Sequence, residues 1–187
     1  MEKQDPMNDF IRRQGPAFLA HLLRRLSDEL VRGAEGWYPQ MGVTAPPRTT
    51  STLLALDECG PLGVTEISTL LRQSHPLVIN WIKQLQASGF VEMRADKADG
   101  RRTLVALTRK GLAEVRRLRE ALTGMGEVSQ LLMDEAAPGL FEALWKMEHA
   151  GRSKPFLQRL QEHAAGVPPK LRTRARKPRR ASAARAT

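Results

Sequence analysis

The sequence has 187 residues, 41% of them hydrophobic, which is enough for one domain with a buried core and short extensions. Lys and Arg number 30 against 20 Asp and Glu, but residues 167–187 hold eight cations and no acid, which leaves 22 cations against 20 acids in residues 1–166. The single cysteine, Cys59, excludes an intramolecular disulfide, and no segment resembles a signal peptide or a membrane span, so a soluble cytoplasmic protein is expected.

The N-terminal part predicts one amphipathic helix. Residues 1–15 are polar and weakly patterned, and they form an N-terminal extension. From Pro16, a residue suited to a first helical turn, apolar side chains recur every four positions. Gly33 and Gly36 are expected to end this helix. The repeating positions are Phe18, Leu22, Leu26 and Leu30.

Three short helices are predicted next. The first covers about residues 49–58. The second starts after Gly63, with Thr65 as its cap, and the third follows Ser74, a hydroxyl residue suited to an N-cap, and ends at Gly89. The apolar stripe of the third helix consists of Val78, Trp81, Ile82 and Leu85.

A β-hairpin is predicted after the third helix. Residues 90–94 alternate apolar and polar side chains, as a half-buried strand does. Residues 95–102 are polar and contain Gly100, which indicates a turn, and residues 103–107 read as the returning strand. The tip of this hairpin carries arginines.

The C-terminal part predicts three further helices and a tail. Thr108 can cap a long helix, and a second helix begins near Pro138. Residues 151–166 form a last helix, whereas residues 167–187 have too few apolar side chains to fold and are expected to be a disordered basic tail. The second of these helices is expected to bury Leu140, Phe141, Leu144, Trp145 and Met147.

The order of helix, helix, helix and hairpin within residues 48–108 resembles the DNA-binding core of the MarR family of transcriptional regulators. The most specific element is Asp-x-Arg at residues 99–101 before a strand that ends in Leu-Thr-x-x-Gly at residues 107–111. The other matching segments are residues 53–56, 60–67, 74–78 and 85–91. The resemblance covers about residues 16–150 and leaves the tail outside.

This resemblance implies a mainly α fold, a winged helix-turn-helix with N- and C-terminal dimerisation helices and a small β-hairpin wing. It implies a homodimer that binds double-stranded DNA and regulates transcription, with no membrane partner. Many members of the family are repressors that a small aromatic effector releases from DNA, so a ligand-responsive repressor is expected.

The third helix is the expected recognition helix, which enters the major groove. With its apolar stripe facing inward, its outer face carries polar and small apolar side chains that can contact base edges or phosphate. At two positions where the family commonly has a small hydroxyl residue and an arginine, this sequence has an isoleucine and an asparagine, which predicts a changed base preference. The candidate contacts are Ser74, His75, Pro76, Ile79, Asn80 and Lys83.

The wing supplies the remaining candidate DNA contacts. Arg101 is expected to enter a minor groove, whose negative potential attracts guanidinium groups. Asp99, two residues earlier, can hold Arg101 in place, and Arg94 and Arg102 can contact the DNA backbone.

No other part of the sequence indicates a chemical site. No pattern predicts catalytic, cofactor-binding or metal-ligating residues, so an enzyme is not expected. Cys59 is interpreted as a small buried apolar residue rather than a redox sensor. An effector pocket between the first helix and the winged region is conceivable, and its lining could include His21, Arg24, Arg25 and Trp37.

Three functions remain open at this point. The first is a sequence-specific regulator. The second is an architectural protein that coats DNA through its basic tail, and the third is a winged helix that binds another protein. A selective preference for one DNA sequence over random DNA separates the first from the second, and failure to bind any duplex favours the third.

Overall fold

A computed structural model describes residues 9–166 of the chain. The chain divides into two compact units, residues 1–129 and 130–187. The basic tail predicted for residues 167–187 lies outside the described residues, as do residues 1–8. None of the helices in the described part is long and apolar enough to cross a membrane.

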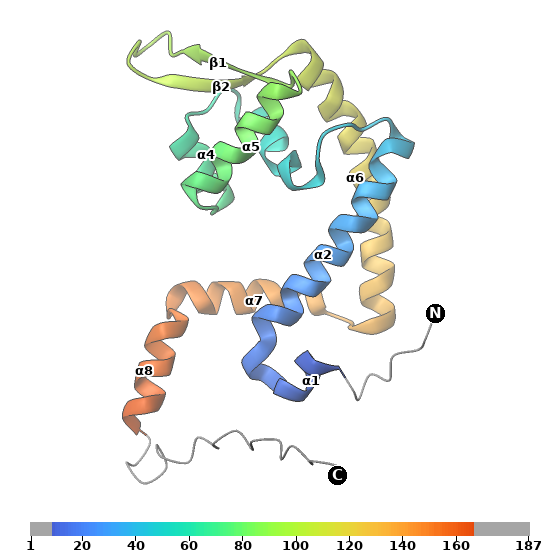
Figure 1. The fold of residues 1–187 in the computed structure, drawn as a ribbon, viewed down its shortest axis with the longest axis vertical. Helices are drawn as coiled ribbons and strands as arrows, with labels where there is room; N and C mark the ends of the chain where they lie inside the picture. The colour runs from blue at the N-terminus through green and yellow to red at the C-terminus, as the bar shows by residue number, and fades with distance from the viewer. Residues whose placement is uncertain (1–8, 167–187) are drawn as a thin grey trace, which may run out of the picture. The chain divides into compact units, whose positions relative to one another are not determined.

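The described residues are mainly helical, with one two-stranded antiparallel sheet, which confirms the predicted fold class (Figure 1). The first unit contains α1 to β2 and most of α6, and the second unit contains the end of α6, α7 and α8. The elements are α1 (Phe10–Gln14), η2 (Gly15–Phe18), α2 (Leu19–Trp37), η3 (Tyr38–Met41), η4 (Pro47–Thr49), α3 (Thr50–Cys59), α4 (Val64–Leu71), α5 (His75–Ala87), β1 (Val91–Ala95), β2 (Thr103–Leu107), α6 (Arg109–Ala136), α7 (Leu140–Ser153) and α8 (Phe156–Gly166).

The sequence predicted that helix α2 ends at Gly33 and Gly36, but the helix does not end there. It continues through Gly33 and Gly36 to Trp37. Glycine in a helix interior costs about 1 kcal/mol relative to alanine. Here Ala34 is buried and Trp37 packs against the core, so burial on the same turns offsets that cost. The chain reverses instead at Gly42, which has a left-handed φ of 68°.

The start of α4 also differs from the prediction. Gly63, not Thr65, is the N-cap, because the Glu66 carboxylate accepts the Gly63 N–H at 2.7 Å and thereby satisfies the free donor at the helix start. At α6 the prediction is confirmed, since the Thr108 hydroxyl accepts the N–H of Gly111 at 3.0 Å.

The core of the winged region joins α3, α4, α5, the hairpin and the first half of α6. In Figure 1 the hairpin β1–β2 runs above α4 and α5, and Val91 pairs with Leu107 in its antiparallel register. Gly111 allows α6 to approach the backbone of Phe90 closely, because a Cβ at position 111 would lie 2.1 Å from the carbonyl oxygen of Phe90. The Leu-Thr-x-x-Gly motif thus packs α6 directly onto the start of the hairpin. The core side chains are Leu53, Leu56, Ile67, Val78, Ile82, Leu85, Phe90, Val91, Val105, Val115, Leu118 and Ala121.

Two burial predictions are wrong. Cys59 is exposed, because it occupies the last residue of α3 before the turn at Gly60. The apolar face of α7 is also uncovered: Phe141 is 56% exposed and Trp145 53% exposed, and of the five predicted residues only Leu140 is half-buried. Within residues 130–166 there are too few other elements to cover that face.

Candidate nucleic-acid interface

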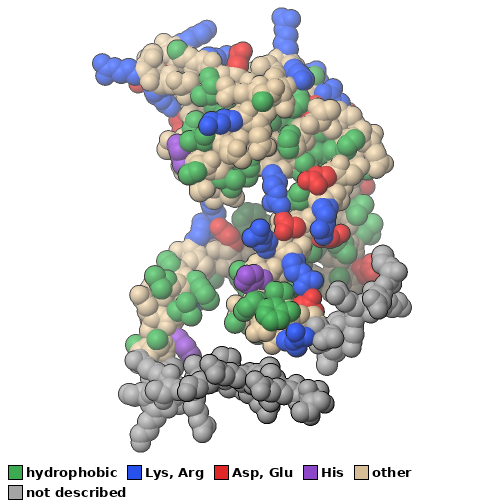
Figure 2. Space-filling view, in the orientation of Figure 1, with side chains coloured by type: hydrophobic (Ala, Val, Ile, Leu, Met, Phe, Trp, Pro, Cys, Tyr) green, Lys and Arg blue, Asp and Glu red, His purple; other side chains and the backbone are tan. Residues whose placement is uncertain are grey.

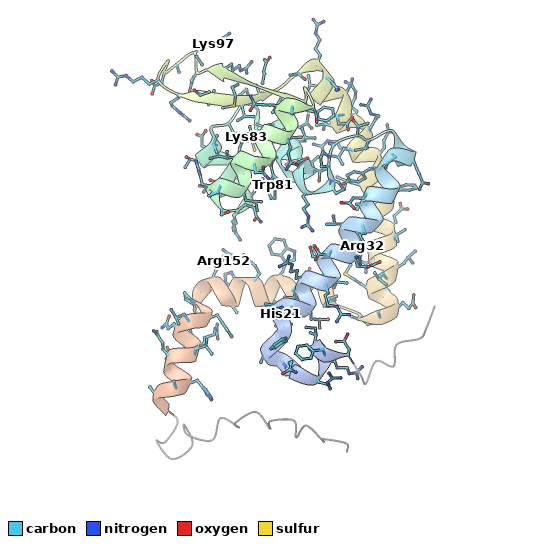
Figure 3. The ribbon with its side chains drawn as sticks, viewed as in Figure 1. His21, Arg32, Trp81, Lys83, Lys97 and Arg152 are labelled. Carbon is cyan, nitrogen blue, oxygen red and sulfur yellow. The ribbon has the colours of Figure 1, made fainter. Side chains whose placement is uncertain are left out.

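Helix α5 presents one face to the core and the other to solvent, as predicted. Val78, Ile82 and Leu85 are fully buried and Trp81 is half-buried. The predicted contacts on the opposite face, His75, Pro76, Asn80 and Lys83, are all exposed. Figure 3 labels Trp81 and Lys83 on this helix. The outer face therefore offers an amide, an imidazole and an ammonium group to a ligand.

Two residues of α5 differ from expectation. Ile79 is half-buried rather than exposed, so part of its side chain has a packing role. Ser74 occupies the N-cap with an extended backbone and is exposed, but its hydroxyl caps no backbone N–H of the described helix. The hydroxyl remains available to an outside group, next to the positive end of the helix dipole.

The tip of the hairpin is held by a compact set of hydrogen bonds. The Asp99 carboxylate accepts the backbone N–H of Arg101 at 3.0 Å, and the Asp99 carbonyl accepts the N–H of Arg102 at 2.9 Å. The sequence suggested that Asp99 holds Arg101 in place. It does so through the Arg101 backbone rather than through the guanidinium. The Arg101 side chain is exposed and free to project from the tip.

Arg102, a predicted contact with the DNA backbone, makes ion pairs within the protein. Its guanidinium lies 2.9 Å from the Glu66 carboxylate and 3.8 Å from that of Asp96. The hydrogen bond from the Gly63 N–H and the Arg102 guanidinium together lower the pKa of Glu66, so the carboxylate is fully ionised at neutral pH. An arginine held by two acids is poorly placed to reach a phosphate as well.

Other cations near the tip remain exposed. Arg94 lies on β1 with an exposed side chain. Lys97, which sequence reasoning missed, is exposed in the turn and is labelled in Figure 3. The signal for Lys97 was its position inside the polar hairpin turn. Figure 2 shows Lys and Arg side chains projecting around the hairpin. Arg94, Lys97 and Arg101 are therefore exposed cations on the hairpin, which also carries the acids Glu92, Asp96 and Asp99.

A buried carboxylate fixes the connection between α2 and the winged region. Glu114 of α6 is fully buried and accepts the N–H groups of Thr44 and Ala45. Its other oxygen pairs with Arg117 at 2.5 Å. Trp37 adds a further anchor, since its indole N–H donates to the carbonyl of Ala121 at 3.2 Å. The sequence signal for Glu114 was an acid within the apolar stripe of a long helix.

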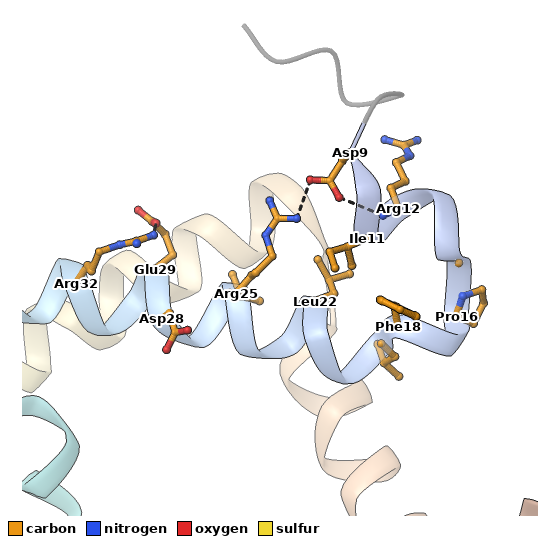
Figure 4. Close-up of a pocket in the computed structure, with 13 residues that line it drawn as sticks. Asp9, Ile11, Arg12, Pro16, Phe18, Leu22, Arg25, Asp28, Glu29 and Arg32 are labelled. Atoms are coloured by element: carbon orange, nitrogen blue, oxygen red, sulfur yellow. Dashed lines mark hydrogen bonds and ion pairs between the residues drawn. The ribbon is translucent and has the colours of Figure 1, made fainter. Parts of the chain in front are cut away.

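One groove lies on the N-terminal helices and includes few of the residues suggested for an effector pocket. This groove of about 960 Å³ is lined by residues of α1, η2 and α2 (Figure 4). Of the four suggested lining residues only Arg25 belongs to it, and its guanidinium is 2.7 Å from the Asp9 carboxylate. Trp37 is instead part of the packing around the core. Among residues 9–166 no group of three His, Cys, Asp or Glu side chains is placed to hold a metal ion.

Comparison with known proteins gives matches by structure. No protein-family profile matches the sequence, and no curated protein matches it either. The structure is similar to that of a cysteine-to-serine mutant of MarR from E. coli complexed with operator DNA, with a TM-score of 0.60 at 17% identity, covering 76% of this chain and 97% of that one.

Two further similar structures belong to proteins for which a small-molecule ligand is known. The PcaV transcriptional regulator from Streptomyces coelicolor, in complex with its natural ligand, gives a TM-score of 0.57 at 20% identity over 82% of this chain and 98% of that one. BpsR from Bordetella bronchiseptica, whose DNA binding is regulated by 6-hydroxynicotinic acid, gives a TM-score of 0.56 at 23% identity over 71% and 91%. The chain therefore has the winged helix-turn-helix fold of the MarR-family transcriptional regulators.

Proposed function

We propose that this protein is a homodimeric, sequence-selective DNA-binding regulator of transcription, a repressor that a small aromatic effector releases from its operator. One observation carries the proposal: the polar face of α5 and the Lys97 and Arg101 side chains at the tip of the hairpin are all exposed on one winged core. In this reading α5 enters a major groove and the hairpin an adjacent minor groove. The DNA-binding core comprises residues 48–108.

The candidate contacts divide into two kinds. Asn80 can form a bidentate pair with adenine, and the exposed part of Ile79 can meet a thymine methyl, so both favour A·T pairs in the half-site. Ser74, Lys83 and Arg94 are suited to phosphate, which fixes position but carries no sequence information. Arg101 is suited to the narrow minor groove of A·T-rich DNA.

Dimerisation is proposed from the uncovered apolar surface at both ends of the chain. Helix α2 exposes Leu22 by 53% and Leu30 by 47%, and α8 exposes Phe156 by 73%. Figure 2 shows hydrophobic side chains on the surface of α7 and α8. Monomeric soluble proteins rarely leave apolar patches larger than a few hundred Å² uncovered. A second copy that covers these helices satisfies this requirement and places two recognition helices for two half-sites.

Effector release is proposed by analogy with the similar proteins. PcaV forms a complex with its natural ligand, and the DNA binding of BpsR is regulated by 6-hydroxynicotinic acid. The groove of α1, η2 and α2 is lined both by apolar residues, including Phe18 and Leu22, and by charged residues. It is large enough for a small aromatic molecule, since ligand pockets typically occupy about 300–1,000 Å³.

Selection of bound duplexes from a random DNA pool tests the proposal. The full chain is expected to enrich one motif with two A·T-containing half-sites about 10 base pairs apart, one helical turn. Uniform binding of all sequences would support an architectural DNA-coating protein instead. Failure to retain any duplex at low salt would support a protein-interaction module.

A further inference from the structure

The Glu66 carboxylate joins two parts of the winged region. One of its oxygens accepts the backbone N–H of Gly63 at 2.7 Å, which caps α4. The other oxygen lies 2.9 Å from the Arg102 guanidinium, at the start of the returning hairpin strand. The same side chain thus connects the first helix of the helix-turn-helix with the base of the hairpin tip.

Backbone contacts place these residues together. Leu62 and Val105 exchange both of their backbone hydrogen bonds, at 2.8 and 3.1 Å, so the segment before α4 is joined to β2 by an isolated antiparallel bridge. On the other side of the turn, Asp96 donates its backbone N–H to the Arg102 carbonyl at 2.9 Å and directs its carboxylate to the Arg102 guanidinium. Arg102 therefore contacts both sides of the turn and α4.

We propose that Glu66 and Arg102 form a brace that fixes the direction of the wing relative to α4 and α5. Arg102 is then a positioning residue for Arg101 and Lys97, and not a DNA contact. The proposal rests on the proposed function, in which the wing meets DNA. An isolated two-stranded hairpin is at best marginally stable, so the direction of its tip depends on contacts with a third element.

The brace acts on binding more than on folding. Both side chains are 48% exposed, and an ion pair of this exposure adds little to the stability of the fold. Without it the tip samples more orientations, and DNA binding must then restrict that motion. Loss of the brace is expected to lower operator affinity even though no DNA contact is removed.

Whether Glu66→Gln weakens or tightens DNA binding distinguishes a positioning role of Arg102 from a DNA-contacting role. Glu66→Gln keeps an oxygen that can accept the Gly63 N–H but removes the charge that holds Arg102. If Arg102 were a DNA contact masked by Glu66, this change would free a cation and tighten binding. If the brace is correct, binding weakens by about twofold to fivefold, the most that an exposed ion pair can supply. Glu92→Gln serves as the matched control, because it also removes one negative charge from the winged region, at an exposed position on β1.

A double-mutant cycle on the selected duplex completes the test. The brace predicts that Arg102→Gln weakens binding by a similar factor and that the double variant is no weaker than either single variant. The brace also predicts that Arg102→Gln lowers the slope of log affinity against log salt concentration by much less than about 0.9, the value expected for a lost phosphate contact. Tighter binding by Glu66→Gln, or additive losses in the cycle, would overturn the brace.

A measurement without DNA separates failure of the brace from failure of the proposed function. Amide hydrogen exchange in the turn, residues 96–102, is expected to be faster in Glu66→Gln than in the wild type and in the Glu92→Gln control. Unchanged exchange would overturn the brace whatever the DNA experiments show. If the exchange changes but the wild type selects no duplex, the brace stands and the DNA-binding function fails.

Discussion

Replacement of Glu114 tests how strongly the buried carboxylate holds the connection between α2 and the winged region. Glu114→Ala leaves the N–H groups of Thr44 and Ala45 without an acceptor. The Ala45 N–H is buried, and an unsatisfied buried donor costs about 1–3 kcal/mol, which predicts a loss of about 1–3 kcal/mol in the free energy of unfolding, whereas the N–H of the exposed Thr44 can bond to water instead. Glu114→Gln keeps an acceptor oxygen and loses only the charge, which predicts a loss of roughly 1–2 kcal/mol.

The effect of Glu114 depends on pH in a definite direction. Burial raises its pKa most strongly, but the hydrogen bonds from Arg117, Thr44 and Ala45 together bring it below the ordinary value of 4.5. A carboxyl whose pKa is lower in the folded state contributes stability above its unfolded pKa and loses it as the pH falls through the folded pKa. The difference between wild type and Glu114→Gln is therefore largest near neutral pH and shrinks in acid.

Urea denaturation at pH 7 and pH 4 measures both effects, with Glu120→Gln as the control because Glu120 is exposed on the same helix. The expected order of stability at pH 7 is wild type and Glu120→Gln, then Glu114→Gln, then Glu114→Ala. Equal stability of Glu114→Ala and the wild type would refute the anchoring role. A difference between wild type and Glu114→Gln that grows in acid would refute the sign of the pKa shift.

Other predictions address the dimer, the contacts and the tail. Light scattering at micromolar concentration is expected to give twice the 20.9 kDa chain mass, and a stable monomer would contradict the dimer. Arg101→Ala is expected to lower operator affinity with unfolding free energy within about 0.5 kcal/mol of wild type, and Asp99→Ala to act in the same direction but more weakly, since it only fixes the Arg101 backbone. Asn80→Ala is expected to relax base preference at one position per half-site by about 1–3 kcal/mol, and selection of an unchanged motif would show that Asn80 reads no base. Removal of residues 167–187 is expected to reduce the salt slope of DNA binding by less than about 7, the value for eight neutralised phosphates, and an unchanged slope would show that the tail does not touch DNA.

The fold could be predicted because its signals are local. The period of Val78, Ile82 and Leu85 identifies the buried face of α5, and the alternation of apolar and polar side chains in residues 90–94 identifies the first strand of the hairpin. Gly111 belongs to a motif whose spacing is set by close packing of α6 on the carbonyl of Phe90. Patterns of this kind depend on neighbours along the chain, so the sequence alone contains them.

The remaining features depend on contacts between distant residues. Glu114 meets the Thr44 segment across about 70 positions of the sequence, and Arg102 meets Glu66 across 36. Nothing local distinguishes Arg102 from a cation that is free to bind DNA. The uncovered face of α7 was predicted to be buried because an apolar stripe indicates burial but does not say whether its own chain or a second copy provides the cover.

The central claim is that α5 lies in a major groove while the hairpin tip lies in a minor groove. Site-directed DNA cleavage tests it most directly, with an iron chelate attached to a single cysteine in a Cys59→Ser background. Gln84→Cys places the chelate on the exposed face of α5, and Lys97→Cys places it at the hairpin tip. On the selected duplex, the account predicts that the chelate at position 84 cuts inside each half-site and that the chelate at position 97 cuts the DNA flanking the half-site. The cuts on the two DNA strands are expected to be offset in opposite directions for the two positions. Cuts spread evenly along the duplex from both positions, or in the same groove from both, would contradict it.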